Sequence, residues 1–176
     1  MGLNFRNLDD RTRALMLSEI DRDITASTLY LSDNLSEHGK EKYPELLQDA
    51  VRTGNDDTLA MAIRGHLNSH EKPRKLKTGG FSKPPVMRIN AHEMLAEGEF
   101  NRFYIRAMCV RAMEDGLSGV VVFRAKLVKN ARSASEQLIG QTIHTEALLS
   151  DLRNSSGIDT ALGLPPGPNS GLSVQL

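Results

Sequence analysis

Residues 91–115 of the chain read AHEMLAEGEFNRFYIRAMCVRAMED, and their apolar side chains recur at the spacing of an α-helix. These apolar side chains occupy two flanks of the helix. They are Leu95, Ile105, Met108 and Ala112 on one flank, and Phe100, Phe103, Tyr104, Ala107 and Val110 on the other. Because both flanks have to be covered, the stretch predicts a long central helix. Asn90 and Glu93 have the spacing of a capping box at its start, and Gly116 is placed to end it.

The chain before this helix, residues 1–67, is predicted to be helical as well. Two of its helices, at residues 43–53 and 56–65, are joined at Gly54, which predicts an antiparallel helical hairpin. Pro44 suits the first turn of the earlier helix, where its missing N–H costs nothing.

After the central helix the pattern changes to shorter elements. Residues 120–128 are apolar and then alternate, which predicts a strand, and residues 145–153 predict a last helix. The predicted fold class is therefore α+β and predominantly helical, with a helical hairpin, a long central helix, a short β element and an extended C-terminal tail. The predicted divisions are an N-terminal helical part (1–67), a basic loop (68–89), the remainder of the same domain (90–156) and the tail (157–176).

The composition is that of a single globular domain. The chain has 176 residues, of which 25% are charged and 39% are apolar, and a chain of this size buries a core without disulfides. Cys109 is the only cysteine, so a secreted disulfide scaffold is excluded. The first ten residues lack the apolar run of a signal peptide, and no apolar run is long enough to span a bilayer. We therefore expect a cytoplasmic protein without membrane contact.

The segment from Lys72 to Arg88 is strongly one-sided in charge. It holds six basic residues and no acid, whereas the remainder of the chain has 16 basic and 22 acidic residues. The six are Lys72, Arg74, Lys75, Lys77, Lys83 and Arg88. The prolines and the Gly79-Gly80 pair in this segment predict a loop. Such a loop either binds the phosphates of a nucleic acid, binds an acidic protein surface or stays solvated, and the sequence leaves these alternatives open.

The C-terminal tail, residues 157–176, combines glycine and proline with five apolar side chains. The five are Leu162, Leu164, Leu172, Val174 and Leu176. Its prolines hold the tail extended, and a purely solvated tail seldom contains so many apolar residues. We therefore predict that the tail docks on neighbouring subunits, adding a strand with its last three apolar residues on one face. Deleting residues 169–176 would then weaken association and leave the monomer folded.

Catalytic and metal-binding patterns are weak in this sequence. His66 and His70 are four residues apart, which supplies at most half of a zinc site. His92 and Glu93 crowd the start of the central helix, where acidic side chains suit the helix dipole. Cys109 lies on an apolar stretch, which favours a packing role. No cofactor and no metal is predicted.

Two stretches in the second half resemble uncharacterised proteins of tailed bacteriophages and prophages. They are residues 99–112, EFNRFYIRAMCVRA, which precede the predicted strand at Val120, and residues 163–174, GLPPGPNSGLSV. The resemblance implies a phage context, in which small non-enzymatic proteins are commonly virion or assembly parts. It assigns no functional residue.

These patterns favour a non-enzymatic structural or assembly protein of a phage-type particle, in the cytoplasm or incorporated into a virion, with protein subunits as its partners. One alternative is a nucleic-acid-binding accessory protein that uses residues 72–88. A second alternative is an enzyme of unrecognised type. It would need a cleft that gathers His92 and Glu93 with Arg102 or Arg106.

Overall fold

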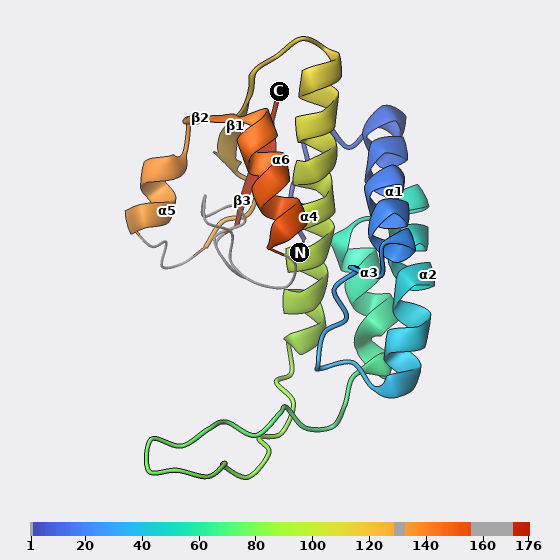
Figure 1. The fold of residues 1–176 in the computed structure, drawn as a ribbon, viewed down its shortest axis with the longest axis vertical. Coiled ribbons are helices and arrows are strands. Elements are labelled where there is room, and N and C mark those ends of the chain that lie inside the picture. The colour runs from blue at the N-terminus through green and yellow to red at the C-terminus, as the bar shows by residue number, and fades with distance from the viewer. Residues whose placement is uncertain (1, 129–132, 156–170) are drawn as a thin grey trace.

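A computed structural model of the chain describes residues 2–128, 133–155 and 171–176. Over these residues the chain has the predicted fold class, a predominantly helical α+β fold with a small antiparallel sheet. The helices α1, α2 and α3 lie on one side of the long helix α4, and α6 and the sheet lie on the other (Figure 1).

Helix α4 (Ala91–Glu114) is the central element that the periodicity predicted. It runs through Gly98 without a break, because packing on two sides offsets the low helix propensity of glycine. Phe100, Tyr104 and Met108 are completely buried. The predicted capping box is wrong: the backbone of Asn90 is not extended as in a capping residue (φ −98°, ψ 16°), and its side chain makes no capping hydrogen bond.

The helices that cover α4 on one side are α1 (Asp10–Thr25) and α3 (Asp56–Ile63), and α2 (Glu37–Thr53) packs on both of these. Helix α2 begins earlier than its periodicity predicted. The Ser36 hydroxyl accepts a hydrogen bond from the N–H of Gly39 and starts the helix there, so Pro44 lies inside it.

The sheet has the strand order β2-β1-β3, and both pairings are antiparallel. Its strands are β1 (Gly119–Arg124), β2 (Thr142–His144) and β3 (Leu172–Gln175), with the short helix α5 (Ser133–Leu138) between β1 and β2, and α6 (Thr145–Asn154) after β2. The predicted extension of β1 to Val128 is wrong. The N–H groups of Ala125 and Lys126 both donate to the carbonyl of Gly171, so the regular ladder with β3 stops at Arg124.

Strand β3 shows that the end of the tail packs on its own chain. Leu172 and Val174 are buried in the main core, and Val174 pairs with Val122 of β1. The side-chain amide of Asn101 in α4 donates to the carbonyl of Leu172 at 2.8 Å. The prediction that Leu172 and Val174 dock on a neighbour is therefore wrong, because both side chains fill the core of this chain.

The other three apolar residues of the predicted docking tail are not part of the described core. Leu176, the last described residue, has 36% of its surface exposed. Leu162 and Leu164 lie outside the described residues. Since β3 supplies core side chains, we now expect that deleting residues 169–176 destabilises the monomer.

Replacing Leu172 by alanine tests this cis arrangement. Leu172 is 1% exposed, so the variant should lose about 2–5 kcal/mol of unfolding free energy, measured by chemical denaturation. Leu127→Ala is the matched control, because Leu127 is 93% exposed and its loss should change stability by less than about 0.5 kcal/mol. Unchanged stability in the Leu172→Ala variant would contradict the packing of β3 on its own chain.

Candidate functional site: a basic hairpin arm

Residues 68–89, called the arm from here on, extend away from the helical body between the 3-10 helix Arg64–His66 and the start of α4 (Figure 1). The sequence predicted a loop here, and the structure shows an antiparallel hairpin. The N–H of Glu71 donates to the carbonyl of Pro85, the N–H of Ser82 to that of Arg74, and the N–H of Leu76 to that of Gly80. These pairs share one register with the bridges His70–Val86 and Lys75–Phe81.

Proline and glycine residues explain why this hairpin does not form two regular strands. Pro73, Pro84 and Pro85 have no N–H to donate, so the ladder is interrupted in its inner half. At the tip, the N–H of Gly79 donates to the carbonyl of Leu76, and both Gly79 and Gly80 have positive φ. A left-handed glycine after a turn is typical of a three-residue hairpin loop.

The inner half of the arm is held to the body and to itself by ion pairs. Lys72 contacts Asp33, in the loop before α2, at 2.6 Å. Glu71 pairs with Arg88 on the returning strand at 2.5 Å and with Arg74 at 3.5 Å. The hydrogen bond from Arg88 is the largest influence that lowers the pKa of Glu71. Three of the six predicted basic residues are therefore neutralised locally.

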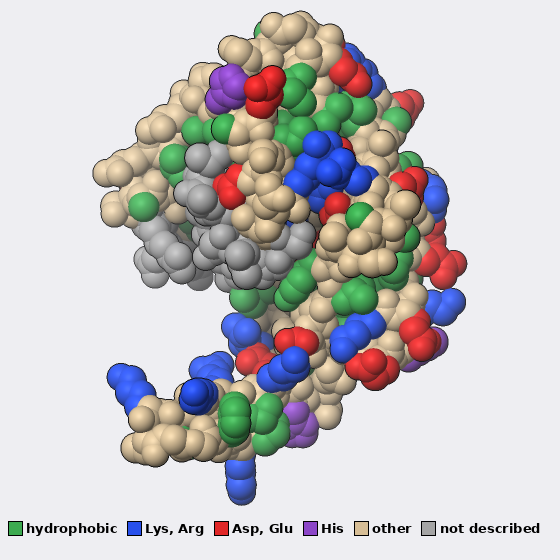
Figure 2. Space-filling model, viewed as in Figure 1, with side chains coloured by type: hydrophobic (Ala, Val, Ile, Leu, Met, Phe, Trp, Pro, Cys, Tyr) green, Lys and Arg blue, Asp and Glu red, His purple; other side chains and the backbone are tan. Residues whose placement is uncertain are grey.

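In the outer half of the arm, residues 75–83, the basic side chains are not neutralised in this way. Lys75, Lys77 and Lys83 are exposed, and none of them makes an ion pair with another described residue. Large apolar side chains are exposed along the same arm: Leu76, Phe81, Val86 and Ile89. Figure 2 shows this mixture of basic and apolar side chains on the narrow projection. Phe81 lies directly across the hairpin from Lys75 and is 71% exposed.

The two histidines proposed as half of a metal site do not share a helix face. The 3-10 helix ends at His66, and Leu67 after it is extended, so His70 lies in the arm. The ring of His66 lies 5.6 Å from that of His38 in α2, and His70 bonds the hydroxyl of Ser69. Among the described residues no three His, Cys, Asp or Glu side chains are grouped to hold a metal ion.

The cleft that an enzyme would need is also not formed by the residues considered for it. Glu93 is exposed in the first turn of α4. Arg102 and Arg106 are buried nine and thirteen residues further along, about 14 and 20 Å on the helix axis. Both arginines are committed to contacts inside the core instead.

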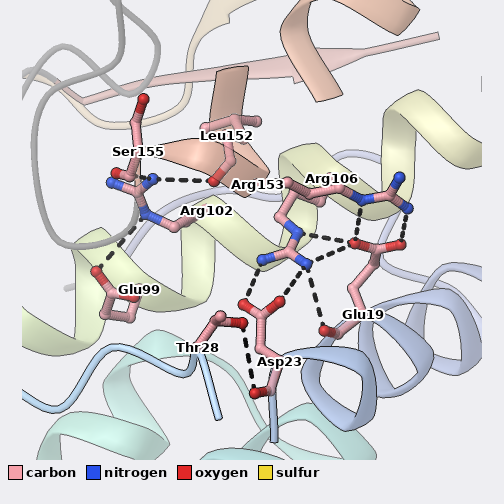
Figure 3. A network of polar contacts seen from close by, with 9 residues as sticks. All are labelled: Glu19, Asp23, Thr28, Glu99, Arg102, Arg106, Leu152, Arg153 and Ser155. Carbon is pink, nitrogen blue, oxygen red and sulfur yellow. Dashed lines mark hydrogen bonds and ion pairs between the residues drawn. The ribbon is translucent and has the colours of Figure 1, made fainter. Parts of the chain in front are cut away.

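The core contacts of these arginines form a buried ionic network that links α1, α4 and α6 (Figure 3). Arg106 donates to Glu19 at 2.8 Å and to both carboxylate oxygens of Asp23 at 2.6 and 2.9 Å. Arg153 of α6 donates to the same Glu19 carboxylate. Burial opposes the ionisation of Glu19, but hydrogen bonds from Arg153 and the charge of Arg106 outweigh it and lower its pKa.

A second buried carboxylate, Glu99, is less well compensated. Its oxygen lies 3.7 Å from the guanidinium of Arg102, which itself donates to the carbonyls of Leu152 and Ser155 at the end of α6 (Figure 3). Burial raises the pKa of Glu99 to about 7, although the charges of Arg102 and Arg106 favour its ionised form. Burial likewise raises the pKa of the Cys109 thiol to about 12, which is unsuited to a nucleophile.

Comparison with models of protein families, with curated proteins and with solved structures found no match for this chain. In the part of the chain that the structure describes, no helix is long and apolar enough to cross a membrane. The candidate site therefore rests on the geometry of the arm. The sequence pointed to its basic residues, but it did not reveal that half of them are paired or that apolar side chains stand beside the others.

The titration of Glu99 predicts how stability depends on pH. Because its folded pKa is about 7 and its ordinary value is 4.5, the folded state binds the proton more tightly. Its contribution to unfolding free energy therefore falls as pH rises from about 4.5 to 7. Glu99→Gln should match the wild type near pH 4.5 and exceed it at pH 8 by on the order of 3 kcal/mol.

Denaturant unfolding at several pH values measures this difference. Glu41→Gln is the control, since its side chain is 76% exposed, and it should leave the pH profile unchanged. If Glu99→Gln is less stable than the wild type at every pH, the ion pair with Arg102 outweighs the cost of burial.

Proposed function

We propose that the protein is a non-enzymatic structural or assembly protein that docks on a neighbouring protein subunit through the outer half of its arm. The observation that carries this proposal is the set of exposed apolar side chains that accompany three unpaired lysines on the projection. Large apolar side chains exposed together on one projection favour contact with a protein surface, and the lysines favour one that is acidic.

Two further observations support an assembly role. The buried Arg106 pairs with Glu19 and Asp23 inside the core, and Arg153 shares Glu19, which is typical of a structural network rather than an open catalytic site. The resemblance of residues 99–112 and 163–174 to phage proteins supports placing this role in a phage-type particle. The docking element differs from the one that the sequence favoured, because β3 belongs to the core and the arm projects.

Binding of nucleic acid by the arm is the second candidate, and the position of Phe81 favours it. An exposed aromatic ring opposite Lys75, with Lys77 and Lys83 nearby, has the chemistry to stack on a base and bind phosphates. Since Lys72, Arg74 and Arg88 are already paired, three lysines remain for phosphates. Binding to duplex DNA would then have a log–log salt slope of about −3, not the steeper value for six contacts.

Photo-cross-linking from the arm separates these two functions. A benzophenone amino acid in place of Phe81, in cells that make the protein naturally, should yield adducts with protein, because Phe81 stands at the proposed interface. The same amino acid in place of Leu127, which is equally open but outside the arm, serves as the control and should give few adducts. Nuclease-sensitive adducts from position 81 would favour nucleic acid. Adducts at position 127 alone would contradict docking through the arm.

A further inference from the structure

The arm is a two-stranded hairpin whose outer half stands clear of the helices and strands of the described part (Figure 1). A hairpin of two strands is only marginally stable in water unless another strand or helix packs on it. In this arm Phe81 and Val86 are 71% and 74% exposed, so the hairpin leaves its own apolar surface uncovered. None of the other described residues covers this apolar surface, which leaves it open to a partner.

Charge indicates what kind of surface fits. The unpaired cations of the arm are all in its outer half, at Lys75, Lys77 and Lys83. In residues 1–67 of the same chain, nine acidic residues remain once the buried Glu19, Asp23 and Asp56 are set aside, and four of the nine lie exposed on helix α2. A second copy of this chain therefore offers exposed carboxylates to these lysines.

The exposed acids of helix α2 lie in a row along one side of the helix. Its acidic residues recur at every fourth position, so they follow one face at intervals of about 6 Å. They are Glu37, Glu41, Glu45 and Asp49, with side chains between 63% and 90% exposed. Lys75 lies in the extended part of the hairpin, and Lys77 follows it in the turn at the tip.

The present partners of these carboxylates do not prevent such a contact. Each acid on this face pairs only with a basic residue three positions away on the same helix, at distances of 2.8 to 3.5 Å. Exposed pairs of this kind contribute little and are screened by salt. One contact of the same chemistry already exists at the base of the arm, where Lys72 meets Asp33 just before α2.

The arm cannot reach α2 of its own molecule with these lysines. In Figure 1 it leaves the lower end of the body and points away from α2. Its inner half is tied to the body in that direction by the pair Lys72–Asp33. The complementary surfaces of one molecule therefore face different neighbours.

We infer that the occupant of the arm is a second copy of this chain, and that the arm lies along the acidic face of α2 of that copy. This inference rests on the proposed docking function and names its partner. The contact joins two different surfaces, so each molecule binds one neighbour through its arm and another through its helix α2. Such head-to-tail contacts build a closed ring or an open chain of subunits.

Reversing the charges of the two surfaces tests the inference, with the association state of each variant measured by sedimentation velocity. The wild type should associate at low salt and dissociate at high salt. The arm variant K75E/K77E/K83E and the helix variant E41K/E45K/D49K should each be monomeric, because like charges then face one another. An equimolar mixture of the two should associate again, since both of its contacts join opposite charges.

Controls separate a lost contact from a lost fold. D10K/E136K/E146K changes the same number of exposed acids outside α2 and should associate as the wild type does. Thermal unfolding checks each variant, and E41Q/E45Q/D49N replaces the helix variant if that one does not fold. A wild type that stays monomeric, or an arm variant that still associates, would overturn the inference. If position 81 then cross-links to a different protein, the docking function stands without self-association; if it cross-links to no protein, both fail.

Discussion

The guanidinium of Arg106 is completely buried, and the positions of α1, α4 and α6 follow from the carboxylates that it requires. A buried cation is tolerated only when its hydrogen bonds are met, and here Glu19 and Asp23, one turn apart on α1, meet them. Arg153 completes the arrangement by sharing Glu19 from α6. Removing Arg106 alone would leave two buried carboxylates with too little positive charge, at a cost of about 3–5 kcal/mol. The network therefore determines how the helices pack, in addition to the apolar core around it.

A body fixed in this way gives the arm a rigid base. Helix α4 begins where the arm ends and leads, after a short turn, into strand β1, so one helix connects the arm to the sheet. The ion pair of Lys72 with Asp33 then orients the inner half of the arm on that base, and the pair of Glu71 with Arg88 joins its two strands. The outer half has no such restraint among the described residues. The body is thus held by packing and ion pairs, while the arm exposes Leu76 and Phe81 beside lysines that make no ion pair with another described residue.

Local patterns in the sequence predicted much of this fold. The periodicity of residues 91–115 predicted α4, and the turn residues around Gly54 predicted the helical hairpin. The prediction for Leu172 and Val174 failed because their positions depend on residues far away in the sequence. Both were expected to bind a neighbouring subunit, but they lie in a strand that pairs with β1, some fifty residues earlier. The basic residues of the arm were visible in the sequence, whereas the pairing of Lys72 with Asp33 depends on the fold. Glu19 and Asp23 are four residues apart on α1 and both face Arg106, so their spacing was the signal in the sequence for the buried network.

Hydrogen exchange at increasing protein concentration tests the docking of the arm most directly. The amides of Glu71, Leu76 and Ser82 bond across the isolated hairpin, so they should exchange quickly in dilute solution. If the arm is covered by another copy, their protection should rise with concentration, while the amides of α4 keep the same slow exchange throughout. Exchange rates in the arm that do not change with concentration would contradict the account.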